Sequence, residues 1–575
     1  MKTIIKNIGM LCLSGCLFSS CLEETFPTTI ATTDQISTSE AAIGAMAQGP
    51  ITAMTSYLGG TSDPGTVGYP GVMLWRDVMI DQNPVADTSY DYYNFYATLQ
   101  AIGNYQTQTN FWTLYYELIY NANLTISVVD VENASETSLG YLSNALGYRA
   151  MAYMDMMRMY EYKRTGISEL DAMADERDIW KLTVPIIRET TTETEGRNNP
   201  RAPFYTMYRF VLNDLNHAEE YLANITVSTK AWVSLGTVYG LKARFWLELA
   251  SRFDRYPEDL TTALEHENDE DGYAALGITT AAQCYENAAS YARKAIDLGY
   301  TPTTQEQWHS TTTGFNSAID SWIWAIILTS ESEGVANASD WESFIAYISP
   351  EVTYGVATST YKARRMLDAK VFDGHLKGTS DWRKYSWVDP DDAGKAPTAN
   401  YQTTLSNTEW ATCPAYTGFK FRPNQGNGTT YLVGNAISLP LMRVEEMYFI
   451  EAEARAHTNG VSTGVSLLES FLNSYRYTDG SYSCSATTMD DFMDEMIAQK
   501  KIEFWGEGIV MWDYKRLERT VLRDYDGTNF VQSHRHNSID GYVAAWLNIY
   551  IPDYEASSNN GVTGKLNPDP TSFID

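Results

Sequence analysis

The sequence has few basic residues, and this lack excludes two common modes of binding. Its 575 residues include 41 Lys and Arg against 72 Asp and Glu, which gives a formal net charge of −31. Binding to nucleic acid or to an anionic membrane surface depends on clustered Lys and Arg, so neither is expected. With only 7 histidines, any acid–base chemistry would fall mainly to carboxylates.

Cysteine is also scarce. Of the 6 cysteines, three lie within the first 21 residues, which leaves Cys284, Cys413 and Cys484 for the folded protein. An odd, sparse set argues against a disulfide framework, and the lack of Cys-x-x-Cys or His-rich surroundings argues against structural zinc. The acidic segment 267–272 resembles a calcium loop without its closing Glu, which favours a solvated loop. We therefore expect neither a metal nor a cofactor.

The first 20 residues are predicted to be a signal peptide. Positive charge at Lys2 and Lys6 precedes an apolar run over 8–18, which is much shorter than the about 20 residues of a membrane span. Small residues then precede Cys21, as in a bacterial lipobox, so Cys21 is expected to carry lipid and residues 21–39 to form a tether. Cys16 is a competing site, because Leu13-Ser14-Gly15-Cys16 fits the short consensus better but leaves a shorter apolar run.

Hydrophobic periodicity predicts a mainly α-helical protein. Apolar residues recur at three- and four-residue steps over 111–129, 141–162 and 204–222. Trp232-x-x-Leu235-Gly236-x-x-Tyr239 matches the first helix of a tetratricopeptide repeat, and the alanine-rich segment 283–298 matches the second. The acidic stretch 253–277 between them is interpreted as a surface insertion. Residues 40–330 are thus predicted to form a tetratricopeptide-like helical repeat scaffold that carries ligand loops.

The sequence pattern changes from helical periodicity to a strand and loops from about residue 317. The apolar run 321–328 predicts a strand, and Gly- and Pro-bearing loops dominate 349–440. Helices are expected again at 441–457 and 490–504. Residues 331–575 are therefore predicted to be a loop-rich lobe with short strands, whose C-terminal helices pack on the scaffold.

Two C-terminal motifs resemble those of the SusD/RagB family. Residues 440–454, Pro-Leu-Met-Arg-Val-Glu-Glu-Met-Tyr-Phe-Ile-Glu-Ala-Glu-Ala, are similar to Pro-Leu-x-Arg-x-Ala-Glu-x-Tyr-Leu-x-x-Ala-Glu-Ala, with Glu445 in place of a small residue. Residues 503–516 are similar to the second motif, with Val510 where Arg is usual. We interpret both motifs as structural. Charges buried singly are costly, so mutual pairing is expected of Glu503, Glu507 and Arg516.

The resemblance implies a lipid-anchored protein on the outer face of the outer membrane. Such a protein binds a poly- or oligosaccharide during nutrient uptake and delivers it to a SusC-like TonB-dependent transporter. The family's members bind rather than catalyse, so no catalytic residue is expected. A peptide-binding member and, less favoured, a surface glycosidase stay as alternatives. Residues 460–464 match Gly-x-Ser-x-Gly, but a helix rather than a strand is expected before them, which favours a polar loop.

Aromatic residues are abundant and indicate where ligand would bind. The 40 Tyr and 15 Trp outnumber the 19 Phe, so most rings carry a polar edge. A sugar presents a flat C–H face to a ring and hydroxyls to polar groups, so the site should combine exposed rings with Asp, Asn or Arg. Two regions satisfy this pattern: residues 75–96, and residues 300–308 together with 330–341. The residues expected to bind ligand are Trp75, Asp81, Tyr90, Tyr92, Tyr93, Trp308 and Trp341. Trp322 and Trp324 lie in the apolar strand and are expected in the core.

Overall fold

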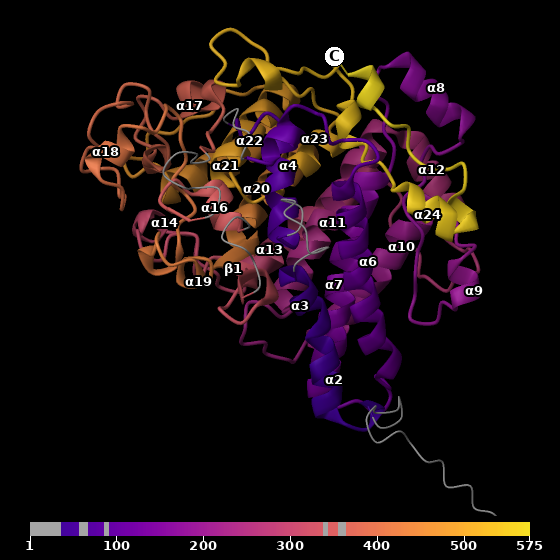
Figure 1. The fold of residues 1–575 in the computed structure, drawn as a ribbon. Coiled ribbons are helices and arrows are strands. Elements are labelled where there is room, and N and C mark those ends of the chain that lie inside the picture. Colours follow the sequence, from indigo (N-terminus) through magenta and orange to yellow (C-terminus); the bar gives the residue numbers. More distant parts are fainter. Residues whose placement is uncertain (1–35, 57–66, 86–90, 337–342, 355–363, 575) are drawn as a thin grey trace, which may run out of the picture.

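The chain folds into a helical array with a loop-rich lobe on one side (Figure 1). The computed structural model describes residues 36–56, 67–85, 91–336, 343–354 and 364–574. The prediction of a mainly α fold is confirmed. None of the described helices is long and apolar enough to cross a membrane.

The array consists of helices that pack side by side in chain order. Each helix contacts the next in the series, and the seven members are α6 (Gln106–Val128), α7 (Glu136–Tyr160), α10 (Phe204–Leu222), α11 (Leu235–Arg255), α13 (Ala281–Ile296), α20 (Val444–Asn459) and α21 (Val461–Tyr475). The helices predicted over 141–162, 204–222 and 283–298 correspond to α7, α10 and α13. Because α20 packs directly on α13, the helical array continues past residue 330 into the C-terminal part of the chain.

Shorter elements surround the array. On the N-terminal side these are α2 (Glu40–Ala47), α3 (Gly49–Thr55), α4 (Tyr69–Met79) and α5 (Tyr93–Ala97). The loop-rich lobe holds α14 (Gln305–His309), α15 (Glu333–Ala336), α16 (Phe344–Ile348), α17 (Ala369–His375), α18 (Asn407–Trp410) and α19 (Tyr431–Gly434). The remaining α-helices are α8 (Ser168–Glu176), α9 (Glu193–Gly196), α12 (Pro257–Glu265), α22 (Met489–Glu503), α23 (Val510–Arg516) and α24 (Asp553–Ser558).

Local sequence explains where the repeat helices begin. The Ser234 hydroxyl accepts the N–H of Thr237 at 3.2 Å, and the Thr280 hydroxyl accepts that of Gln283 at 3.2 Å. Both are capping boxes, which satisfy backbone donors that the first helical turn leaves unpaired. Gly236 of the repeat motif faces Tyr300, because a Cβ there would lie 2.6 Å from the Tyr300 hydroxyl. The close approach that this glycine permits is thus to the segment after α13.

A two-stranded antiparallel sheet joins the array to the lobe. Strand β1 (Trp322–Ile327) pairs with β2 (Ser438–Arg443), with Trp322 opposite Arg443. The predicted strand at 321–328 is confirmed, and both of its tryptophans are buried. The helix predicted from residue 441 is wrong at its start, because residues 441–443 belong to β2 and α20 begins at Val444.

One loop prediction also needs correction. Residues 460–464 are not a polar loop, because α21 begins at Val461 and only Gly460, at φ 93°, separates it from α20. That φ lies in the left-handed region that glycine adopts without steric cost, which allows a one-residue connection. The acidic stretch 253–277, predicted to be an insertion between the two repeat helices, contains the short helix α12.

Candidate functional site

Two of the rings expected to contact ligand, Trp75 and Tyr93, lie in the core. Trp75 is 1% exposed within α4 and packs edge-on against Phe111, with ring centroids 5.0 Å apart. Tyr93 is also 1% exposed, and its hydroxyl donates to the Gly71 carbonyl at 3.2 Å. Neither ring offers a face on which a sugar could stack. The expectation that they are exposed is wrong because every residue of α4 is buried by its neighbours and α5 packs against it.

Trp308 is likewise a core residue. It is 1% exposed in α14, and its indole N–H donates to the Ser386 hydroxyl at 2.7 Å. The Trp308 ring packs edge-on against Phe315 and Trp382, so it is not available to ligand. The expected site residues Tyr90 and Trp341, and the expected lipid site Cys21, lie outside the described residues.

Asp81 is used by the protein itself. Its Oδ1 accepts Lys501 Nζ at 2.8 Å and the Tyr514 hydroxyl, and its Oδ2 accepts the Leu522 N–H at 3.3 Å. Burial acts to raise its pKa, but Lys501 and these hydrogen bonds outweigh burial and hold the pKa below its ordinary value. Asp81 therefore ties the end of α4 to α22 and α23. Because its carboxylate is engaged by these groups, the structure does not favour the prediction that Asp81 contacts ligand.

A cleft of about 1030 Å³ opens beside Asp81. Burial, opposed by Lys501 and reinforced by Asp81, raises the pKa of Asp368 in this cleft to about 6. Carboxylates outnumber cations along its walls, which disfavours an anionic ligand. The carboxylate residues are Asp81, Asp368, Asp490, Asp491, Asp494, Glu495, Glu518 and Asp540, against Lys370, Lys501 and Arg519.

Among the described residues of 75–96, the residues that are not buried are Tyr92, Asn94 and Phe95. We call these three residues the α5 surface. Tyr92 and Asn94 are half-buried and Phe95 is 39% exposed. The Tyr92 and Phe95 rings have centroids 6.4 Å apart. Two accessible rings beside a side-chain amide provide the stacking and hydrogen-bonding groups that a sugar requires. Of the described residues expected to bind ligand, Tyr92 alone keeps an accessible ring. Phe95, directly before Tyr96, was not singled out by sequence.

Buried contacts fix the α5 surface in place. Asp91, directly before it, pairs with Arg365 at 2.7 Å, and both side chains are at most 1% exposed. Burial outweighs Arg365 and raises the pKa of Asp91. The Arg365 guanidinium also lies 5.0 Å from the centre of the Tyr93 ring and donates to the Tyr347 carbonyl at 2.8 Å. The surface is therefore held between α4 and the loop-rich lobe rather than on a free loop.

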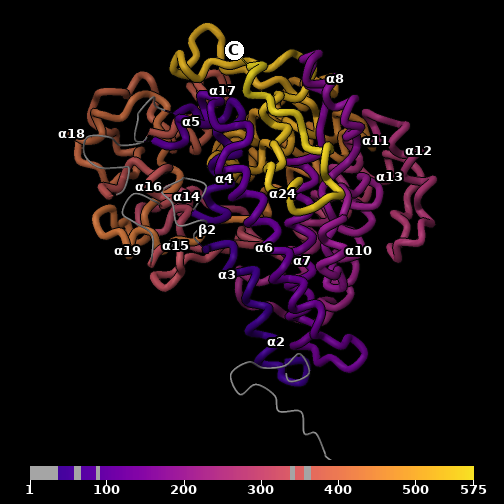
Figure 2. The backbone as a smooth tube through the Cα atoms, turned by 45° about the vertical axis from the view of Figure 1, so that its right-hand side comes forward, coloured from indigo at the N-terminus to yellow at the C-terminus, as the bar shows by residue number. Residues whose placement is uncertain are grey.

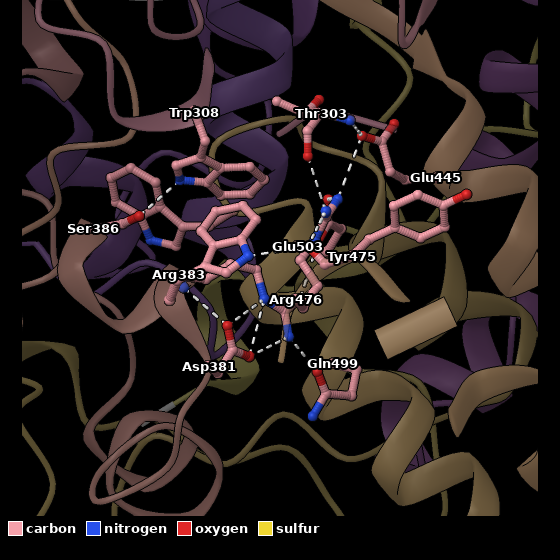
Figure 3. A network of polar contacts seen from close by, with 12 residues as sticks. Thr303, Trp308, Asp381, Arg383, Ser386, Glu445, Tyr475, Arg476, Gln499 and Glu503 are labelled. Atoms are coloured by element: carbon pink, nitrogen blue, oxygen red, sulfur yellow. Dashed lines mark hydrogen bonds and ion pairs between the residues drawn. The ribbon is translucent and has the colours of Figure 1, made fainter. Parts of the chain in front are cut away.

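The family-motif residues form a buried ion network, part of which is shown in Figure 3. Glu503 lies at its centre and accepts from three guanidinium groups, at 2.9 Å from Arg383, 3.1 Å from Arg443 and 2.8 Å from Arg476. All four side chains are 0% exposed. Although burial acts to raise it, these arginines hold the pKa of Glu503 well below its ordinary range.

The other motif residues have different partners from those expected. Glu507 pairs with Arg443 at 2.9 Å and with Lys420 at 2.5 Å. Arg516 pairs with Glu453 and Asp513, both at 2.6 Å. The prediction that Glu503, Glu507 and Arg516 are paired is thus right, but the prediction that they pair with one another is wrong. Asp513 lies in the same helix as Arg516, whereas Arg443, Lys420 and Glu453 come from other segments of the chain.

The contacts of Glu445 explain why a Glu is accommodated where the motif usually has a small residue. Its carboxylate is buried, accepts the Thr303 N–H at 2.7 Å and lies 3.0 Å from Arg443. The charge that replaces a small residue therefore joins the same network. The carboxylates of the network do not face solvent, because Asp381, Glu445 and Glu503 are 0% exposed and Glu507 is 4% exposed.

Two segments of the sequence match models of known protein families. Residues 372–575 match the sequence model of the SusD family, and residues 71–247 match one described as "Starch-binding associating with outer membrane". A search of curated proteins finds no match.

Solved structures share the fold over nearly the whole chain. A SusD-like carbohydrate binding protein from Bacteroides vulgatus is 18% identical, with a TM-score of 0.64 over 91% of this chain and 97% of that one. A SusD superfamily protein from Bacteroides thetaiotaomicron is 15% identical, with a TM-score of 0.63 over 92% of this chain and 100% of that one. The chain shares the fold of these proteins. Both motifs lie within residues 372–575, the part of the chain that belongs to the SusD family by its sequence model.

Proposed function

We propose that the protein is a cell-surface lipoprotein that binds a glycan and delivers it to a SusC-like TonB-dependent transporter. The observation that carries the proposal is the match of residues 71–247 to a family described as starch-binding and associated with the outer membrane. That matched region includes the α5 surface, which offers exposed rings beside an amide. The protein acts as a binder, and catalysis is not part of the proposal.

The charge of the molecule narrows the class of glycan. The formal net charge is −31, and the cleft beside Asp81 is rich in carboxylates. A uronate or sulfated polymer would approach against this field, whereas a neutral polysaccharide would not. We therefore propose a neutral glycan.

Affinity gel electrophoresis against a panel of polysaccharides tests the binding function. Soluble starch, galactomannan, laminarin and acidic pectin serve as probes, and at least one neutral polymer is expected to retard the wild-type protein. A Tyr92→Ala/Phe95→Ala double variant is expected to lose about tenfold in affinity, because exposed aromatic contacts dominate such interfaces. Tyr542→Ala is the matched control, since Tyr542 is 38% exposed and lies outside the α5 surface.

The same assay separates the alternatives. Retardation by no polysaccharide, together with affinity for peptides, would favour a peptide-binding member of the family. Release of oligosaccharides from a retarding polymer by the purified protein would show a glycosidase and overturn the binding-only reading.

Membrane attachment and the transporter are tested together. A lipid on Cys21 would confine the protein to the membrane surface and raise its effective concentration near a barrel partner. Tagged wild-type protein extracted in mild detergent is expected to bring down a large β-barrel protein, and Cys21→Ala is expected to release the protein from membranes. Release by Cys16→Ala instead would move the lipid site, and recovery of the tagged protein alone would count against the transporter.

A further inference from the structure

An aromatic cleft lies between α6 and α24. Its volume is about 460 Å³, within the roughly 300–1,000 Å³ of typical small-molecule sites. In Figure 2, α24 crosses the face formed by α6 and its neighbours. The cleft shares no residue with the α5 surface, and we call it the α6–α24 cleft.

A ladder of aromatic rings on α6 forms one wall. Trp112, Tyr116 and Tyr120 are spaced by four residues, so they stand on one face of the helix over about 12 Å. Their exposure rises along the ladder, from 2% at Trp112, through a half-buried Tyr116, to 61% at Tyr120. The Trp112 and Tyr116 rings have centroids 5.0 Å apart. Such a graded series forms a floor at one end and an open ring at the other.

Helix α24 supplies the second wall, and its position is fixed. The Trp112 indole N–H donates to Glu555 Oε2 at 3.1 Å, and Glu555 Oε1 accepts the Asn559 amide at 3.2 Å. Tyr554, one residue before Glu555, is 41% exposed. Its hydroxyl lies 3.4 Å from that of Thr113, so the ring is held beside α6.

The polar groups of the cleft suit a neutral ligand. None of the described residues that line it is a Lys or Arg. Glu117 lies at its rim, and within the described part of the chain no cation forms an ion pair with it. Partial burial, with a smaller contribution from Glu333, raises the pKa of Glu117 above its ordinary value. Carboxylate acceptors beside open rings match the hydroxyls and C–H faces of an uncharged sugar, whereas an anionic sugar would find no counter-charge.

We infer that the α6–α24 cleft is a second contact site for neutral glycan, separate from the α5 surface. The inference rests on the proposed glycan-binding function. A polymer that engages both sites gains affinity through multivalency, because its second contact is intramolecular.

A double variant at the open end of the cleft tests the inference. Tyr120→Ala/Tyr554→Ala is expected to lose about tenfold in affinity for whichever neutral polysaccharide of the panel retards the wild type most. Tyr542→Ala is expected to behave as wild type. As an independent readout, that polysaccharide is expected to protect Tyr120 and Tyr554, but not Tyr542, from nitration by tetranitromethane, as measured by mass spectrometry.

The outcomes distinguish failure of this site from failure of the function. If the wild type is retarded while the double variant is retarded equally and neither tyrosine is protected, the cleft is not a glycan site and the proposed function stands. If no polysaccharide retards the wild type, both fail. If the double variant keeps its glycan affinity but loses co-purification of the β-barrel protein, the cleft is a protein-docking surface and the inference is overturned.

Discussion

Replacing Glu503 by Gln is expected to lower the free energy of unfolding by about 3–5 kcal/mol, because it removes one charge from a buried ion network. Glu503 accepts from Arg383, Arg443 and Arg476, all fully buried. A glutamine keeps the shape but not the charge, and its amide N–H₂ would face guanidinium donors. The measurement is urea denaturation followed by far-ultraviolet circular dichroism.

The network is charge-balanced, which is why a single change has so large an effect. Four carboxylates face four cations, and the groups are Asp381, Glu445, Glu503 and Glu507 with Arg383, Lys420, Arg443 and Arg476. Removal of one negative charge leaves a positive excess where water cannot solvate it. Glu132→Gln is the matched control, since Glu132 is exposed, and it is expected to shift stability by less than about 0.5 kcal/mol.

The effect should also depend on pH. The pKa of Glu503 is held well below its ordinary value in the folded state, so its ionised form stabilises the fold at pH above the unfolded pKa, about 4.3. That stabilisation is lost as pH falls from there towards the folded pKa. The difference between wild type and Glu503→Gln should therefore be full at pH 7 and narrow below about pH 4. A difference at pH 7 of under about 1 kcal/mol would contradict the assigned role of the network.

Gly508→Ala is expected to lower the free energy of unfolding by about 2–4 kcal/mol, from two causes that add. Gly508 has φ +70°, in the left-handed region that costs a non-glycine residue roughly 1–2 kcal/mol. A Cβ there would also lie 2.5–2.8 Å from backbone atoms of Met73 in α4. Backbone cannot rotate out of the way as a side chain can, so α4 or the motif must shift. Thermal and urea unfolding measure the loss.

Gly480→Ala isolates the first cause, the strain of the left-handed backbone. Gly480 has a similar φ, +65°, but a Cβ there would meet nothing within 4 Å. Its replacement should therefore cost only the conformational strain, about 1 kcal/mol. Equal destabilisation by the two variants would show that the close approach to Met73 has no energetic weight.

The contacts of Glu503 and Gly508 explain why the second motif has these residues at these positions. Glu503 closes α22 and collects charge from the lobe and from β2, while Gly508 lets the following turn lie against α4. The Gly506 N–H, between them, donates to Asp77 of α4 at 2.6 Å. The motif therefore joins the array, the lobe and the N-terminal helices, and the same α4 positions the α5 surface.

The sequence by itself determined the local features of this protein. Three- and four-residue periodicity located α7, α10 and α13, and capping residues such as Ser234 and Thr280 mark where helices start. Periodicity and capping depend on neighbours within a few residues, so they can be read without the fold. The strand with Trp322 and Trp324 in the core was predictable for the same reason.

Tertiary structure alone decided which rings are exposed and which charges pair. Trp75 is followed by Arg76 and Asp77, and Trp308 lies between Gln307 and His309. Both rings are nevertheless buried, because burial depends on elements that pack around a residue from elsewhere in the chain. Glu503 finds Arg383, which is 120 residues away, and Trp112 finds Glu555, which is 443 residues away. No local pattern encodes such contacts. Residues 441–443 became strand rather than helix because β1 was there to pair with them, since a strand is stable only beside its partner.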